Sequence, residues 1–408
     1  MEIIEPVSGA IRVLMVSQRM LPYVAGAELR ALSLAKALIA IGVEVDILTT
    51  RYKAGLAAED VIEGVKARRL PVLREPTSGP RQLASSAVKA SQFFAAAAWV
   101  AANGSSYDVI HGHCLSSTTL GAALGARIRR RPILVKPSLG GPDGELSKIV
   151  SSPYRAMALR LLRRVDRFAV IDAEIADELA GVGVSRERLI SIPNGLDLER
   201  FHPLEKEDRE DLRARLGLPS GALALFVGQL VVRKGVSQLL EAWEAVSRSL
   251  PTATLVFAGD GPLADEVKGR ATSSHSRVML LGVRDDVADL MRAADVLVLP
   301  SRNEGFANVV VEAMACGLPV ISGRTGIARH LPIDGTAGRL IDPENPSDLA
   351  GALVKILSSP DRGAALGERG RQLVQQFDLR KVAPAYLALY ESMLGRRISS
   401  SETDNRPP

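Results

Sequence analysis

The chain has 408 residues, of which 51 are Lys or Arg and 46 are Asp or Glu, so its formal net charge is +5. Apolar residues make up 47% and aromatic residues 4%, and Cys114 and Cys316 are the only cysteines. The length favours two domains. The composition excludes a disulfide scaffold and a cysteine-based zinc cluster, and it favours helices packed on sheets. We therefore expect an α/β protein of the reducing cytoplasm.

The most apolar alanine stretch, FFAAAAWVAA at 93–102, is too short for a bilayer, which needs about 20 helical residues. The acidic start MEIIEP also argues against export. Arginines cluster as RIRRR (127–131) and again as Arg155, Arg160, Arg163, Arg164 and Arg167. A solvated helix face would explain these clusters, and so would an anionic partner or attachment to the inner face of the membrane.

Short β-branched runs alternate with longer amphipathic runs, which predicts βαβ units and parallel sheets. In the first half, the expected strands are 11–17, 44–50, 108–113, 132–138, 167–172 and 189–193, and the expected helices include 27–41 and 173–181. A charged segment, 204–221, interrupts the pattern. The strands expected after it are 222–228, 253–259, 278–282, 295–301 and 318–323. We expect two Rossmann-like, doubly wound domains, residues 1–203 and 204–378, facing a central cleft.

Each half begins with a strand and a glycine turn, where backbone amides at a helix N-terminus can hold phosphate. In PYVAGAE (22–28), Gly26 precedes the helix, although ordinary turn chemistry would also explain it. In FVGQLVVRKG (226–235), Arg233 and Lys234 follow a strand. Two adjacent cations suit a diphosphate, and the alternative is a pair of solvated loop charges.

The segment GDGPLA (259–264) matches the G-x-G-x-x-A dinucleotide fingerprint in letters. Pro262 removes an amide that a phosphate-binding turn would use, so a proline at the first position of a helix is the simpler interpretation. A nicotinamide-dependent oxidoreductase is the alternative function that this motif leaves open.

The segment HGH places His111 and His113 at the carboxyl end of a strand. We expect the two imidazoles to lie on opposite faces, with one toward the cleft as a hydrogen-bond donor to substrate or in a structural role. Without further ligands, two such histidines make a poor zinc site.

The segment SRNEGFANVVVEAMACG (301–317) has two glutamates eight positions apart. Glu304 is expected at the carboxyl edge of a sheet, followed by a helix over 306–317 whose first amides face an anion. Glu312 lies inside that apolar helix, where a carboxylate costs several kcal/mol unless it is paired or hydrogen-bonded. A ribose diol or an arginine would satisfy it.

Taken in order, these segments closely resemble the retaining nucleotide-sugar glycosyltransferases of family 4, which have the GT-B fold. The resemblance extends from about residue 11 to residue 395. It rests on AGAE, HGH, ISIPNGLDLERFHP (190–203), VGQLVVRKG, FAGDGPL, DLMRAADVLVLPS (289–301) and EGFANVVVEAMACGLPV. It implies transfer of a hexosyl group from a UDP- or GDP-sugar to an unidentified saccharide or lipid-linked acceptor, with retention of configuration. It implies no metal or other cofactor, and no nucleic acid is expected as a partner.

The resemblance also implies roles for individual residues. Glu304 would contact the hydroxyls of the donor sugar, Glu312 the ribose and Lys234 the diphosphate, while His113 would lie beside the transferring sugar. The implied catalytic residues are thus His113, Lys234 and Glu304. The implied donor site comprises Gly26, Gln229, Arg233, Lys234, Val283, Glu304, Gly305, Phe306, Ala307, Asn308 and Glu312. The first domain would be the acceptor side, completed by a returning helix at 379–396, and 397–408 would be a disordered tail.

Two segments depart from the family pattern. Gln229 stands where an arginine is usual, and GIARH (326–330) replaces the usual G-G-x-P-E. The glycine-rich run at 135–146 is expected to shape the acceptor site. An epimerase or hydrolase of the same architecture, and a non-catalytic carbohydrate-binding protein, remain alternatives.

Overall fold

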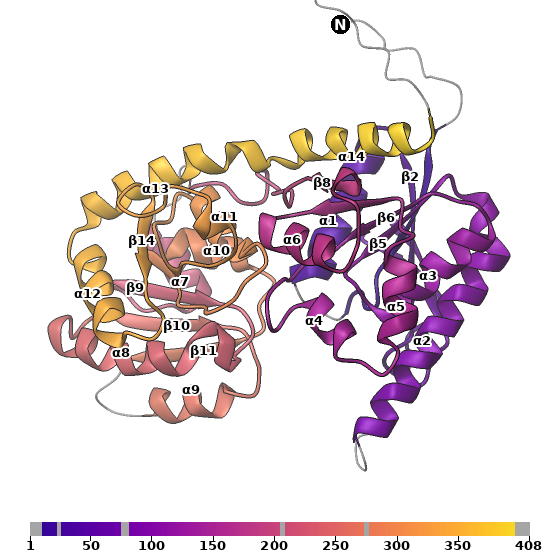
Figure 1. Cartoon of the computed structure of the whole chain (residues 1–408). Coiled ribbons are helices and arrows are strands. Elements are labelled where there is room, and N and C mark those ends of the chain that lie inside the picture. Colours follow the sequence, from indigo (N-terminus) through magenta and orange to yellow (C-terminus); the bar gives the residue numbers. More distant parts are fainter. Residues whose placement is uncertain (1–9, 23–25, 75–80, 205–208, 273–276, 396–408) are drawn as a thin grey trace, which may run out of the picture. The chain divides into compact units, whose positions relative to one another are not determined.

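The computed structural model describes residues 10–22, 26–74, 81–204, 209–272 and 277–395 (Figure 1). These residues form two compact units, which we describe separately. Unit 1 comprises residues up to Gly195 together with those from Leu379 onward, and unit 2 comprises Leu196–Asp378. Unit 2 begins before the boundary expected at 203/204 because residues 196–203 bond within it. The amide of Leu196 donates to the carbonyl of Phe377 (2.6 Å), and Arg292 donates to the carbonyl of His202 (2.9 Å). The expected tail at 397–408 lies outside the described residues.

Unit 1 contains one eight-stranded sheet in the order β3-β4-β2-β1-β5-β6-β7-β8. Its strands are β1 (Arg12–Val16), β2 (Glu44–Thr50), β3 (Glu59–Ile62), β4 (Val65–Leu70), β5 (Val109–His113), β6 (Ile133–Lys136), β7 (Arg167–Val170) and β8 (Leu189–Ser191). All neighbours are parallel except the hairpin β3–β4. The α-helices are α1 (Gly26–Ala40), α2 (Arg81–Asn103), α3 (Ser117–Ile128), α4 (Glu145–Val150), α5 (Arg155–Leu162), α6 (Ala173–Gly181) and α14 (Leu379–Met393).

Unit 2 contains a six-stranded, fully parallel sheet in the order β11-β10-β9-β12-β13-β14. Its strands are β9 (Leu223–Val227), β10 (Thr254–Ala258), β11 (Val278–Gly282), β12 (Val296–Leu299), β13 (Val320–Gly323) and β14 (Gly338–Ile341). The α-helices are α7 (Arg209–Leu216), α8 (Val236–Ser249), α9 (Ala264–Ala271), α10 (Val287–Ala293), α11 (Asn308–Ala315), α12 (Pro346–Leu357) and α13 (Pro360–Val374). The order is that of a doubly wound Rossmann sheet, and the predicted α/β class is confirmed.

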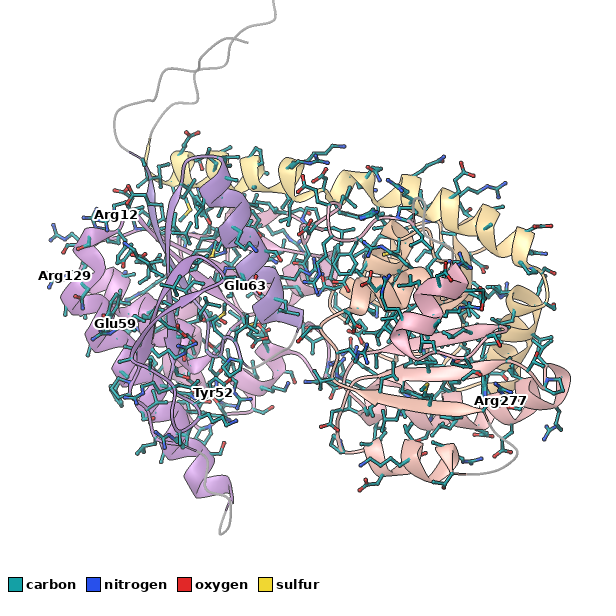
Figure 2. The ribbon with its side chains drawn as sticks, turned by 180° about the vertical axis from the view of Figure 1, so that it is seen from behind. Arg12, Tyr52, Glu59, Glu63, Arg129 and Arg277 are labelled. Atoms are coloured by element: carbon teal, nitrogen blue, oxygen red, sulfur yellow. The ribbon has the colours of Figure 1, made fainter. Side chains whose placement is uncertain are left out.

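Every strand expected from the sequence is present, but three strands were not predicted. The hairpin β3–β4 carries charges at many positions, since it lies at the edge of the sheet and leaves one face in water. Its turn contains Glu63 and Gly64, both with positive φ (45° and 88°), and Glu59 and Glu63 are labelled in Figure 2. The third, β14, begins with Gly338 and an exposed Arg339, so its sequence lacks the continuous apolar run of a buried strand.

The last helix, α14, packs into the core of unit 1. Val382, Ala383, Tyr386, Leu389 and Tyr390 are all buried in one cluster with residues of β1, β2 and α1. This apolar face explains why the end of the chain returns to the first unit. None of the helices in the described ranges is long and apolar enough to cross a bilayer.

Candidate active site

Both sheets have a point where the strand order reverses, and ligands of such folds bind at the carboxyl ends of the strands there. In unit 1 this point lies between β1 and β5, and in unit 2 between β9 and β12. Residues predicted as catalytic lie at these points. His113 ends β5, Lys234 follows β9 and Glu304 follows β12.

In unit 2, Lys234 and Glu304 form a largely buried ion pair. The Nζ of Lys234 lies 2.7 Å from Oε1 of Glu304, and the two side chains are 11% and 12% exposed. The same carboxylate oxygen lies 3.0 Å from the hydroxyl of Ser301 and 3.4 Å from Nη1 of Arg233. Three donors therefore converge on one carboxylate, and the charges of Lys234 and Glu304 compensate each other.

A close backbone contact holds the loops after β9 and β12 together. The amide of Arg302 donates to the carbonyl of Arg233 (2.8 Å). Gly235 has a φ of 71°, and a Cβ added there would lie 2.1 Å from the carbonyl oxygen of Pro300. Only glycine fits this approach, which places Lys234 opposite Glu304.

Helix α11 begins at Asn308, two residues later than predicted. Ala307 precedes it in the left-handed conformation (φ 57°), which ends the loop sharply and caps the helix without a side-chain hydrogen bond. Gly305, Phe306 and Ala307 are buried, and Asn308 is half-buried. Glu312 is half-buried on α11 and interacts with another group of the protein. The first turn of α11 therefore begins after Glu304 and the three buried residues that follow it, and its amides are those that an anion site at a helix N-terminus uses.

Three other residues predicted for the donor site are exposed to solvent. Val283 follows β11 and is 60% exposed. The side chain of Gln229 is exposed, and Gly26 is the exposed first residue of α1. Within unit 2, no hydrogen bond or ion pair joins the side chain of Gln229 or Val283 to Lys234 or Glu304 among the described residues.

The two histidines of β5 lie on the same face of the strand, so the expectation of opposite faces was wrong. Residues two positions apart in a strand point the same way, and the imidazoles of His111 and His113 stack with their centroids 4.3 Å apart. Nδ1 of His111 lies 2.7 Å from the hydroxyl of Tyr390 on α14. Burial and then the charge of Lys136 lower the pKa of His113 to about 3. His113 is therefore a neutral imidazole at physiological pH.

Lys136 and Asn194 were not predicted as site residues. Lys136 is the register partner of His113 on β6, and its Nζ donates to Oδ1 of Asn194. Burial lowers the pKa of Lys136 to about 8. Both residues stand just at or after a strand end, in VKPS and IPNG. That position is the signal that could have identified them.

Two carboxylates, also not predicted, lie near this end of the sheet. Glu145 accepts from the amide of Leu115 (2.6 Å), and its other oxygen accepts from Ser138. Burial raises the pKa of Glu145, and burial likewise raises the pKa of Glu28 on α1. Glu145 belongs to the glycine-rich run 135–146, whose turn it holds against β5.

The glycines of GDGPLA have a packing role. A Cβ at Gly259 would lie 1.9 Å from the carbonyl oxygen of Gly228, and one at Gly261 would lie 2.6 Å from that of Leu230. Helix α9 begins only at Ala264, so Pro262 is not at its first position as we expected. The two glycines therefore allow the loop after β10 to pack closely against the loop after β9. This packing explains the GDGPLA sequence without a dinucleotide-binding role.

The segment 326–330, which departs from the family pattern, packs on the Glu304 loop. The amide of Ile327 donates to the carbonyl of Phe306 (3.2 Å), and Ile327 is buried. Arg329 and His330 are exposed. The replacements thus lie beside the predicted sugar contact. No group of three or more His, Cys, Asp or Glu side chains within the described ranges is placed to hold a metal ion.

Two family models match the chain. "Glycosyl transferases group 1" matches residues 208–373, and "Glycosyl transferase 4-like domain" matches residues 25–195. D-inositol 3-phosphate glycosyltransferase 1 of Catenulispora acidiphila is 31% identical over 380 residues, which cover 86% of this chain and 87% of that protein.

Solved structures share the fold. Sucrose-phosphate synthase from Thermosynechococcus elongatus has a TM-score of 0.77 at 25% identity, with 95% of this chain and 100% of that chain covered. HepE from Anabaena, solved in complex with UDP and glucose, has a TM-score of 0.76 at 22% identity, with 94% and 100% covered. The predicted GT-B fold is confirmed.

Proposed function

Because the chain belongs to the glycosyl transferases group 1 family and is a glycosyltransferase, we propose that it transfers a hexosyl group from a UDP- or GDP-sugar with retention of configuration. The observation that carries this proposal is the pairing of Lys234 with Glu304 at the reversal point of the second sheet. A cation suited to a diphosphate and an acceptor suited to sugar hydroxyls stand side by side there. The enzyme we propose needs no metal.

In the proposed complex, Lys234 and Arg233 turn from Glu304 to the diphosphate, and sugar hydroxyls replace them as donors to Glu304. The N-terminus of α11 adds its dipole to the same anion. Glu312, on the same helix, would accept from the ribose. Since each polar group keeps a partner with and without the donor, the exchange costs little desolvation.

The reaction breaks the bond from the anomeric carbon to the diphosphate oxygen and forms one from that carbon to the acceptor oxygen on the same face. The acceptor proton passes to the departing diphosphate. Lys234 stabilises the negative charge that develops on the diphosphate. His113 is neutral, because burial keeps its pKa at about 3, so it contributes a hydrogen bond to the sugar and not a positive charge.

A thermal-shift series with UDP, GDP, ADP and their hexosyl derivatives tests the donor site. A ligand that binds only the folded chain at 100 times its Kd adds about 2.7 kcal/mol to the free energy of unfolding. We expect a UDP- or GDP-sugar to raise the Tm of the wild type and Lys234→Ala to lose that shift. Lys268→Ala, at an exposed lysine paired with Asp265, is the control and keeps it. No shift with any nucleotide, or an equal shift in Lys234→Ala, would contradict the proposal.

Product analysis then tests the chemistry. With the stabilising donor and a panel of acceptors, we expect a glycoside whose anomeric configuration matches that of the donor. The panel includes inositol 3-phosphate, after the name of the Catenulispora relative, as well as lipid-linked saccharides. Free sugar or an epimerised donor, formed at full rate without acceptor, would instead favour the hydrolase or epimerase alternative.

A further inference from the structure

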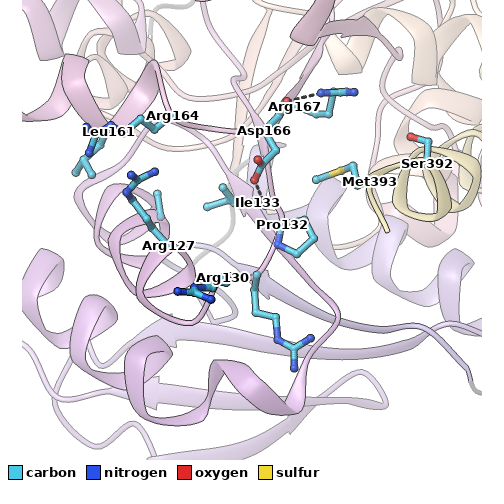
Figure 3. Close-up of a pocket in the computed structure, with 12 residues that line it drawn as sticks. Arg127, Arg130, Pro132, Ile133, Leu161, Arg164, Asp166, Arg167, Ser392 and Met393 are labelled. Carbon is cyan, nitrogen blue, oxygen red and sulfur yellow. Dashed lines mark hydrogen bonds between the residues drawn. The ribbon is translucent and has the colours of Figure 1, made fainter. Parts of the chain in front are cut away.

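A second site lies in unit 1, where the two arginine clusters of the sequence meet. A cavity of about 600 Å³ is lined there by residues of α3, the start of β6, the end of α5, the start of β7 and the end of α14 (Figure 3). Its arginines are Arg127, Arg130, Arg131, Arg164 and Arg167. Segments more than 30 positions apart in the sequence thus contribute cations to one pocket.

The positive charge of this pocket is not compensated. Asp166 is the one carboxylate among its lining residues, and its Oδ2 already accepts from the amide of Ile133 (2.8 Å). The guanidinium groups of Arg127, Arg130 and Arg164 make no ion pair or hydrogen bond with any residue that the structure describes. In contrast, Arg213 in unit 2 pairs with Asp295 at 2.8 Å.

The remaining two arginines are oriented by the backbone. Arg131 donates to the carbonyl of Ser105 (2.7 Å), and Arg167 donates to that of Asp166 (2.9 Å). Neither contact neutralises charge. Arg130 has a left-handed φ of 53°, in the turn after α3. Glycine would fit that conformation without the penalty of about 1 kcal/mol or more that arginine incurs.

The pocket lies at the amino ends of the strands, whereas His113 lies at their carboxyl ends. Ile133 and Arg167 are the first residues of β6 and β7, whereas His113 and Lys136 are the last residues of β5 and β6. Because β5, β6 and β7 are parallel, their first residues lie together at one end of the strands and their last residues lie together at the other end. An occupant of the arginine pocket would not compete with the donor.

We propose that this pocket binds a soluble small molecule that carries two or more phosphate groups. Guanidinium forks bind phosphate oxygens two at a time, and several uncompensated forks around one cavity suit several phosphates. Ile133, Leu161 and Met393 add an apolar wall. The volume of about 600 Å³ is that of a small-molecule site, which suits a soluble ligand of a few phosphate groups.

Isothermal titration of the full chain with tripolyphosphate tests this proposal. The Lys234→Ala background removes the diphosphate contact of the donor site. We expect one binding site per chain, weakened at least tenfold by Arg127→Gln with Arg164→Gln. The matched control is Arg155→Gln with Arg160→Gln, which removes the same charge from exposed positions of α5 outside the pocket, and it should bind as before. Equal affinity in both double variants would overturn the proposal.

Two further experiments test whether the loss of affinity reflects unfolding of the variant and whether the binding partner is a soluble ligand or a membrane surface. Arg127→Lys with Arg164→Lys keeps the charge and the fold but loses the planar forks, so we expect an intermediate loss of affinity. Co-sedimentation with vesicles of phosphatidylcholine and phosphatidylserine tests a membrane surface. Binding to these vesicles together with no measurable binding of tripolyphosphate would overturn the soluble-ligand proposal in favour of a membrane contact.

Discussion

At the residue scale, the ionic state of His113 follows from where the strand puts it. Its side chain is 4% exposed, and it has Lys136 as its register partner on β6. Desolvation and a neighbouring positive charge both disfavour the protonated imidazole. The neutral imidazole of His113 can therefore form hydrogen bonds. Its burial lowers the free energy of unfolding at acidic pH.

Folding stability should fall below pH 6.5 because of His113. The unfolded histidine titrates near 6.5, whereas the folded pKa is about 3. Between these values the unfolded state binds a proton that the folded state does not. One such group lowers the free energy of unfolding by up to about 1.4 kcal/mol per pH unit, and it has no effect above pH 6.5. His113→Asn should flatten this acid slope.

Urea unfolding at pH 7, 6 and 5 measures that slope. His330→Asn, at an exposed histidine, is the matched control and should retain the wild-type slope. If His113→Asn falls as steeply with acid as the wild type, the neutral, buried imidazole is ruled out.

At the element scale, the η3 turn (Val232–Lys234) is set by the glycine that follows it. Gly235 lets this turn approach the end of β12, and the approach brings Lys234 to Glu304. The helix α11 depends on a comparable device, since Ala307 adopts a left-handed conformation immediately before it. Both elements of the candidate donor site are thus defined by how the chain turns before or after them.

Gly235→Ala should destabilise unit 2 by more than its backbone conformation alone explains. A left-handed alanine costs about 1–2 kcal/mol, and its Cβ would also meet the carbonyl of Pro300 at 2.1 Å. Gly217→Ala isolates the first cost, since Gly217 has a similar φ of 68° and a Cβ added there would meet nothing within 4 Å. Urea unfolding should show a clearly larger loss for Gly235→Ala, with loss of transferase activity. Equal losses would mean that the loop contact is not required.

At the scale of the whole molecule, the chain returns to its first unit at its end. Unit 1 is incomplete without α14, because Tyr386 and Tyr390 are each no more than 1% exposed within its core. The same helix supplies the hydroxyl that pairs with His111. The C-terminal segment therefore stabilises the sheet that carries His113.

Truncation after Asp378 should unfold unit 1 and leave unit 2 folded. Each large apolar side chain buried by α14 contributes about 1.5–3 kcal/mol, and several of them together approach the roughly 5–15 kcal/mol that stabilises a domain. Hydrogen exchange read by mass spectrometry should show rapid exchange throughout β1–β8 and protection in β9–β14. A chain ending at Gly395 is the control. Protected β1–β8 in the shorter chain would show that α14 is dispensable.

The sequence predicted most of this architecture because its signals are local. The periodicity of buried strands, the stop signals of helices and the order of motifs predicted the α/β class and all strands except β3, β4 and β14. Glu304 and Lys234 were predicted as site residues from their motifs and from family resemblance, and the structure brings them together as an ion pair. The errors were also local in origin. The alternation rule was misapplied to His111 and His113, which are two positions apart and share a face, and α11 starts later than predicted because Ala307 is left-handed.

The amino-acid sequence alone determined the class of the fold, the two halves and the residue types at the strand ends. Only the tertiary structure decided which of those residues meet. Lys234 pairs with Glu304 across 70 positions, His111 with Tyr390 across 279, and the arginines near 130 share a pocket with those near 165. The physical reason is that periodicity depends on a residue's neighbours in the chain. Pairing depends on the order in which parallel strands are laid down and on the crossovers between them.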